Sequence, residues 1–222
     1  APNPSPAARH QSLGEEIANS VSHGVGLLAA LVATPFLIAS AVARGDAAFI
    51  AGACVFALSM VALYGASMVY HALPRNRAKQ VAQLLDHGAI FLLIAGTITP
   101  FCLLTMSGTW ATAILIAVWS AAAIGIVIEL VWTGSPKWVS ALIYVAVGWI
   151  GALAFPSIVG SAGVAAGLLI ATGGLLYTVG AVVYATGRPN PSPTYFGYHE
   201  VFHVFVIGAA ATHFAAIAFF AL

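Results

Sequence analysis

Long apolar runs, separated by short polar connections, follow one another along almost the whole chain. They cover residues 17–43, 47–73, 81–105, 110–132, 138–155, 162–186 and 199–222. A helix needs roughly 20 apolar residues to cross the hydrocarbon core of a bilayer. Only helices and closed barrels satisfy every backbone polar group in lipid, and the runs lack the polar and apolar alternation of barrel strands. The sequence therefore predicts an all-α membrane protein with seven transmembrane helices.

The composition excludes two other classes of protein. Of the 222 residues, 61% are hydrophobic and 6% are charged, whereas soluble domains carry about 25% charged residues. The net charge is +1, and seven Lys and Arg residues are too few to form a nucleic-acid-binding face.

The two cysteines are expected to be free thiols. Cys54 and Cys102 lie in separate apolar runs and form no CxxC motif.

Two parts of the chain differ in composition. Residues 1–14 contain three prolines and no long apolar stretch, which predicts a short mobile N-terminal tail without the apolar core of a secretory signal. Residues 15–222 then form the seven-helix transmembrane domain.

Positive charge predicts how this domain is oriented. With seven helices, the N-terminus shares one side of the membrane with the second, fourth and sixth connections. That side would hold six of the seven basic residues: Arg9, Arg75, Arg77, Lys79, Lys137 and Arg188. The opposite side would hold Arg44 alone. Because basic residues concentrate in cytoplasmic loops, the N-terminus is expected in the cytoplasm and the C-terminus outside.

Polar side chains gather at the cytoplasmic ends of four expected helices. Ionisable groups inside membrane spans are costly and usually mark a functional site. The second helix ends with Ser67 and His71, and the third begins with Asp86 and His87. The first helix begins with Glu16, Asn19 and His23. The seventh begins with His199 and His203. The sequence thus predicts that these groups lie at one depth in the membrane.

Spacing indicates a metal site among them. His199 and His203 are four residues apart and so lie on one face of a helix, an arrangement that can share one metal ion. His71 would complete a three-histidine set with one open position for water, which is typical of catalytic zinc sites. Asp86 is then expected to accept a proton from that water, and Ser67 to hydrogen-bond it or a substrate oxygen. Other divalent ions also suit three histidines.

Each of these groups also has a simpler interpretation. An isolated HxxxH pair often serves as interfacial hydrogen-bonding groups. Glu200 lies about 100° from the face of the histidine pair, which favours an interfacial or supporting role, and His87 is expected to bond solvent or a backbone carbonyl. His213 lies roughly 15 Å beyond His203, too far for the same ion, and is expected to form a hydrogen bond with a neighbouring helix.

The stripe formed by Glu16, Asn19 and His23 either caps the first helix or supports the ligands. Glu129 is expected to anchor the fourth helix at the interface.

Several segments together resemble one family. They are "GEEIANSVSHG", "SMVYHAL", "LLDHGAIFLLIAGTITPF", "YVAVGWIGAL", "GGLLYTVGAVVYA" and "HEVFHVFVIGAAATHF". In this order, from Gly14 onwards, they are similar to hemolysin III proteins, the bacterial branch of the group that contains the progestin and adiponectin receptors. The wider superfamily includes alkaline ceramidases. The chain departs from the pattern at Ile98, where relatives commonly have Tyr.

The resemblance implies a seven-helix protein of the plasma membrane, the inner membrane of a bacterium, with a cytoplasmic N-terminus. It also implies zinc held by His71, His199 and His203, with Asp86 and Ser67 around the water. Members of the superfamily are regarded as metal-dependent hydrolases, so membrane lipids are the expected substrates or ligands.

Three functions compete at this point. The first is a zinc-dependent hydrolase of a lipid amide or ester, and the second is a sensor or regulator of membrane state in which zinc staples the helices. The third is a pore or cytolysin, which is disfavoured because charged residues do not line successive turns of any span. The sequence indicates no protein or nucleic-acid partner.

Overall fold

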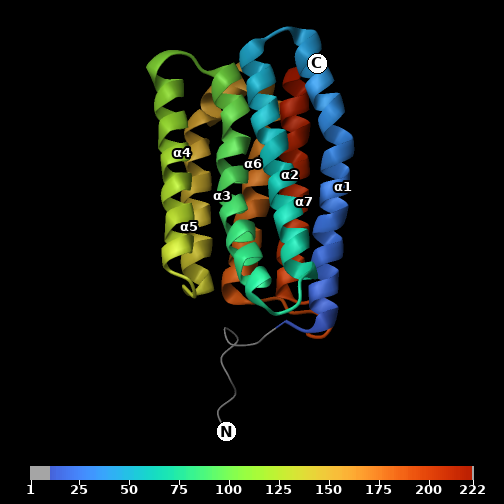
Figure 1. Cartoon of the computed structure of the whole chain (residues 1–222). Helices are drawn as coiled ribbons and strands as arrows, with labels where there is room; N and C mark the ends of the chain where they lie inside the picture. The colour runs from blue at the N-terminus through green and yellow to red at the C-terminus, as the bar shows by residue number, and fades with distance from the viewer. Residues whose placement is uncertain (1–10, 222) are drawn as a thin grey trace.

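The computed structural model describes residues 11–221, with side chains as far as residue 218. Its elements are α1 (Leu13–Arg44), α2 (Ala47–Ala72), α3 (Arg77–Thr105), α4 (Gly108–Val131), α5 (Lys137–Trp149), the short 3-10 helix η2 (Ile150–Ala154), α6 (Phe155–Thr186) and α7 (Tyr198–Ala221). Figure 1 shows them standing side by side as one bundle. The all-helical class that the sequence predicts is therefore confirmed for the described residues.

Six stretches of the described residues are long and apolar enough to cross a membrane, one fewer than predicted. The count is lower because α5, η2 and α6 follow one another without a break and form one stretch of 50 residues, Lys137–Thr186. At about 1.5 Å per residue, a straight helix of that length would be more than twice as long as a bilayer core of about 30 Å.

This long stretch reverses its direction. At its start, Lys137 hydrogen-bonds the hydroxyl of Tyr198. At its end, Gly187 terminates α6 and lies next to the Tyr198 ring. Both ends therefore lie at the same end of the bundle. Gly163 has non-helical backbone angles, φ 82° and ψ 174°, a region open to glycine because it has no Cβ.

Capping residues explain why two helices begin earlier than the apolar pattern indicates. Ser12 and Glu15 form a capping box at the start of α1, and the Asn76 side chain accepts a hydrogen bond from the Lys79 amide at the start of α3. Such caps satisfy the free amides of a first turn. Each helix therefore includes polar residues before its apolar run, and the apolar pattern alone does not indicate them. The predicted mobile tail, residues 1–14, lies mostly outside the described residues, and α1 begins within it at Leu13.

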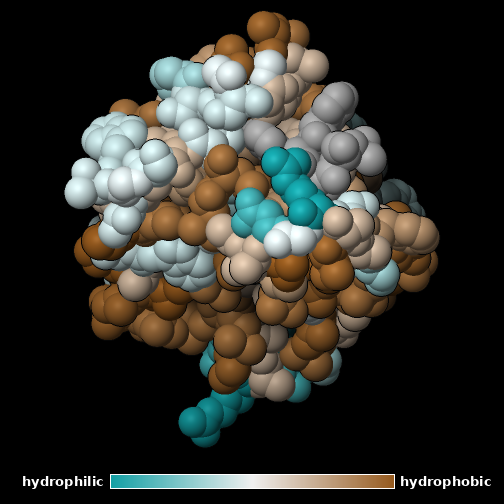
Figure 2. Space-filling view, turned by 90° about the horizontal axis from the view of Figure 1, so that it is seen from above, coloured by the Kyte–Doolittle hydropathy of each residue, from teal (hydrophilic) through white to brown (hydrophobic). Residues whose placement is uncertain are grey.

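The outer surface of the bundle is apolar along its length. Large side chains such as Leu28, Leu58 and Leu168 are more than 60% exposed, as expected where a helix faces lipid. Figure 2 views the bundle from the end that is uppermost in Figure 1, and hydrophilic residues occupy little of that face. Arg75, Arg77 and Lys79 lie at the opposite end, around the connection between α2 and α3.

Inside the bundle, α2 packs against both α1 and α3, and α7 packs against α6 and α1. One close approach between α2 and α3 is at Gly52, where an added Cβ would lie 2.7 Å from the Cα of Pro100. Pro100 belongs to α3 itself, so its backbone cannot withdraw without moving that helix. Small residues commonly permit this kind of close approach between helices in membranes.

We therefore expect Gly52→Ala to destabilise the protein by about 1–3 kcal/mol, as overpacking usually does. Gly65→Ala is the matched control on the same helix, because nothing lies within 4 Å of a Cβ added there. The measurement is thermal unfolding in detergent. Equal stabilities of the two variants would contradict the close approach of α2 and α3.

Candidate metal centre

Three histidines from two helices meet inside the bundle. His71 lies in the last turn of α2, and His199 and His203 lie in the first turns of α7. One nitrogen of each lies within 4.8 Å of the corresponding nitrogens of the other two. The ring centres are 4.7 Å apart for the pair on α7, and 5.0 and 5.3 Å from His71 to His199 and His203. This group could hold a metal ion.

Hydrogen bonds on the outer nitrogens orient two of the rings. The Nδ1 of His71 lies 2.9 Å from the Oε2 of Glu16, a carboxylate oxygen that accepts a hydrogen bond from the ring. The Nδ1 of His203 lies 3.1 Å from the Ser22 hydroxyl, which donates its own hydrogen to the Asn19 carbonyl and so accepts from the ring. In each neutral ring the proton is therefore on Nδ1, and the lone pair is on Nε2.

The inner nitrogens fit a metal ion. The Nε2 atoms of His71 and His199 are buried and have no hydrogen-bond partner. A buried polar atom left unpaired costs about 1–3 kcal/mol, so such atoms call for an explanation. Imidazole nitrogens close to one another are the donor set of a three-histidine metal site, and outer partners such as those of His71 and His203 orient the rings of such sites.

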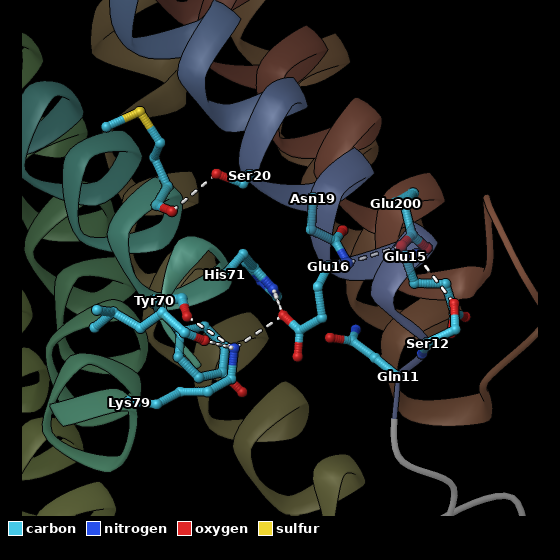
Figure 3. A network of polar contacts seen from close by, with 12 residues as sticks. Gln11, Ser12, Glu15, Glu16, Asn19, Ser20, Tyr70, His71, Lys79 and Glu200 are labelled. Atoms are coloured by element: carbon cyan, nitrogen blue, oxygen red, sulfur yellow. Dashed lines mark hydrogen bonds and ion pairs between the residues drawn. The ribbon is translucent and has the colours of Figure 1, made fainter. Parts of the chain in front are cut away.

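Glu16 also connects the histidines to a buried lysine. Its Oε2 lies 3.0 Å from the Nζ of Lys79, and Lys79 donates further hydrogen bonds to the carbonyls of Tyr70 at 2.9 Å and Leu73 at 3.2 Å. Figure 3 shows the His71 and Lys79 side chains directed at the same carboxylate from α2 and α3. One carboxylate of α1 therefore holds groups from two other helices.

A second polar contact fixes α7 against α1. The Asn19 amide donates to Glu200 Oε1 at 2.8 Å, and the backbone amide of Gly197 donates to Glu200 Oε2 at 2.7 Å. Glu200 is fully buried, so it supports the start of α7 and does not lie at an aqueous interface. The bond from Asn19 places the start of α7, and with it His199 and His203, relative to α1 (Figure 3 shows the pairing of Asn19 and Glu200).

Asp86 and Ser67 lie in the same region, and both are buried. The Asp86 carboxylate is within electrostatic reach of His71 and Ser67, although the Ser67 hydroxyl has no partner of hydrogen-bond geometry. Asp86 faces a cavity that His199 and His203 also line. The structure thus brings together all five residues that the sequence singles out.

The cavity extends from the histidines into the bundle. It has a volume of about 500 Å³ and is enclosed mainly by α3, α5, α6 and α7. Apart from a few polar groups, its walls are apolar side chains such as Leu93, Phe101, Ile158 and Val206. Ile98 also lines it, so the wall is apolar where relatives commonly have Tyr. An apolar space that opens onto a polar cluster suits a ligand with an apolar body and a polar head.

The sequence can be compared with those of known proteins. The Haemolysin-III related family matches residues 11–214. The chain belongs to this family. It is 34% identical to the Hemolysin-3 homolog of Bacillus subtilis (strain 168), over 94% of this chain and 95% of that protein. It is 33% identical to the Hemolysin-3 of Bacillus cereus, over 96% and 94% of the two chains.

More distant relatives occur in animals. The human Monocyte to macrophage differentiation factor is 26% identical, over 74% of this chain and 68% of that protein. No solved structure matches the chain. The family that the sequence motifs resemble is therefore confirmed, and this haemolysin-III-related protein is an integral membrane protein.

Three peripheral predictions can be compared with the structure. His87 lies 2.8 Å from the Gln83 carbonyl through Nδ1, as expected. His213 lies 3.1 Å from the Ile170 carbonyl of α6, which confirms the predicted bond between helices. Glu129 accepts a hydrogen bond from the Tyr144 hydroxyl at 3.3 Å and so joins α4 to α5.

Two roles were left open by sequence reasoning. Glu16 contacts a histidine of the cluster directly. His23 stacks on His203 with ring centres 3.5 Å apart and planes 7° from parallel. Glu16, Asn19 and His23 are spaced at i, i+3 and i+7, which indicates that they share one face of a helix. This spacing does not indicate what that face contacts.

Glu16 should therefore strengthen metal binding by this haemolysin-III-related protein. We expect Glu16→Gln to weaken the affinity for Zn²⁺ about 10- to 100-fold, as loss of an outer partner of a metal-bound histidine usually does. Glu129→Gln is the control, because Glu129 contacts Tyr144 and no histidine of the cluster. Affinity is measured by competition with a chelator in detergent, and equal affinities of the two variants would contradict the role of Glu16.

Proposed function

We propose that this protein is a zinc-dependent hydrolase of an amide or ester bond in a membrane lipid. The observation that carries the proposal is the cluster of three imidazoles, with a buried carboxylate beside it, at the polar end of an apolar cavity. Lipids fit this cavity better than soluble peptides, because its walls offer few partners for backbone polar groups.

His71, His199 and His203 would hold the ion. When bound by three neutral imidazoles, zinc supplies Lewis acidity and lowers the pKa of a coordinated water to about 7. The protein supplies the remaining groups. The acyl chain packs in the cavity, where apolar walls exclude bulk water, and the scissile carbonyl lies at the cavity's polar end.

Asp86 has the role of general base and then of general acid. It accepts a proton as water adds to the carbonyl carbon, and it returns that proton to the amine or alcohol that leaves. The Ser67 hydroxyl, which has no partner of its own, donates a hydrogen bond to the oxygen that becomes negatively charged. The products are a fatty acid and a lipid amine or alcohol, so atoms and charge balance.

The second candidate is a sensor of membrane state in which the ion has a structural role. The specific observation in its favour is the polar network, which joins α1, α2, α3 and α7 around the histidines. A metal that staples these helices would rigidify the bundle without any chemistry. A cytolytic pore is a weaker candidate, because the described cavity is mostly apolar.

We also infer that the chain crosses the membrane seven times with its N-terminus in the cytoplasm. The reversal within Lys137–Thr186 supports two spans in that stretch, each long enough for a bilayer core. Arg75, Arg77 and Lys79 lie at the same end of the bundle as the start of α1, and the positive-inside rule favours a cytoplasmic position for that end. The histidine cluster would then lie near the cytoplasmic headgroups.

Catalysis can be separated from metal binding with two variants. We expect Asp86→Asn to retain zinc but to lose at least 100-fold in turnover, because an amide cannot accept the proton. His203→Ala should lose both the zinc and the activity. The measurement is turnover of a panel of lipid amides and esters by purified protein, with zinc content determined in parallel. Full activity of Asp86→Asn, or an inactive wild type that binds zinc, would favour the sensor.

The topology predicts opposite locations for two fusion points. A reporter that is active only in the cytoplasm should be active when fused after Lys79 and inactive when fused to the C-terminus. A periplasmic reporter should give the opposite result at each point. Finding both points on one side would contradict an odd number of spans.

A further inference from the structure

A second polar position lies deep in the cavity, away from the histidine cluster. Tyr177 of α6 and His213 of α7 both line the cavity, and their ring centres are 5.6 Å apart. The Tyr177 hydroxyl and the Nδ1 of His213 are each buried without a hydrogen-bond partner. His213 is 7% exposed, so bulk water does not solvate it.

The hydrogen bond of His213 defines what its free nitrogen needs. Its Nε2 lies 3.1 Å from the Ile170 carbonyl, and a carbonyl can only accept, so Nε2 carries the proton. A charged imidazole without an anion is costly in an apolar interior, and the neutral ring leaves a lone pair on Nδ1. Nδ1 therefore requires a donor, whereas the Tyr177 hydroxyl can both donate and accept.

The two side chains converge on the cavity from opposite directions. In a helix the side chains tilt toward the N-terminus. Because α6 and α7 run antiparallel, as Figure 1 shows, Tyr177 and His213 lean toward each other along the bundle axis. His213 follows His203 by ten residues, which is roughly 15 Å along a helix.

We propose that Tyr177 and His213 form a subsite for a hydroxyl group carried by the apolar part of the ligand. A hydroxyl can donate to the Nδ1 of His213 and accept from Tyr177 at the same time. A carbonyl or a carboxylate offers no hydrogen to Nδ1, and a plain alkyl chain leaves both atoms unpaired. The ligand class is then a lipid with a polar head at the histidines and a hydroxyl about 15 Å along its chain.

This distance predicts where the hydroxyl lies. An extended chain advances about 3.5 Å for every three bonds, so 15 Å corresponds to about a dozen bonds. The inference rests on the proposed function in one respect, since it places the polar head at the histidine cluster. It does not require that any bond be cleaved.

The test measures binding of saturated fatty acids with and without a hydroxyl at the far end, over a range of chain lengths. In the wild type, the hydroxyl should increase affinity about fivefold, the gain of one ordinary net hydrogen bond, and the gain should peak near a dozen bonds. Tyr177→Phe should reduce this preference, because only the bond to the Nδ1 of His213 remains, and should leave the affinity for the plain acid within about twofold. Binding is measured in detergent with purified protein, both metal-free and zinc-loaded.

Tyr144→Phe is the matched control. Tyr144 lines the same cavity, but its hydroxyl already bonds Glu129, so the preference should persist. No preference at any length, or a preference that Tyr177→Phe retains in full, would overturn the subsite and leave water as the partner of both atoms. Asp86→Asn should keep the preference. Preference without lipid turnover would refute the hydrolase alone, and turnover without preference would refute the subsite alone.

Discussion

The arrangement of the polar centre depends on the Glu16 carboxylate, which accepts hydrogen bonds from His71 and Lys79. Three buried or half-buried ionisable groups from three helices are acceptable in an apolar bundle because each has a partner. Without the carboxylate, the Lys79 ammonium would be left with two carbonyl oxygens and the face of the Tyr70 ring, none of which carries a negative charge. The His71 ring would also lose the contact that directs its other nitrogen inward. The position of α1 therefore helps to set the orientation of the His71 ring, although His71 belongs to α2.

The sequence predicts most of this arrangement because membrane spans restrict where polar groups can lie. Apolar run lengths indicate the helices, and the ends at which Ser67, Asp86 and His199 occur indicate a shared depth. The i, i+4 pair on α7 fixes which face His199 and His203 present. These features are local, and local patterns determine helix faces and helix ends well.

The remaining features depend on packing between helices, which one sequence does not encode locally. The Glu16, Asn19 and His23 stripe identifies a face of α1, but only the packing of α1 against α2 and α7 shows that it contacts His71, Glu200 and His203. The continuous helical stretch through η2 was missed for a similar reason. Residues 150–162 include Gly151, Pro156 and Gly160, which indicate a boundary after the first of two apolar runs. Pro156 lies in the first turn of α6, where a proline is tolerated, so the helix continues to the non-helical backbone of Gly163.

The histidines of the centre come from residues 71, 199 and 203 of a 222-residue chain, which has a consequence for biosynthesis. Membrane helices are inserted in order as the ribosome delivers them, and α7 follows all the other described helices. Until it arrives, Asn19 has no Glu200 to bond and His71 has neither partner histidine. The earlier helices therefore enter the bilayer with the Asn19 amide and the Nε2 of His71 unpaired or hydrated, although Glu16 can already accept from the Nδ1 of His71. The three histidines can therefore meet only after α7 has entered the membrane, so an ion that needs all three could be bound only from that stage onwards.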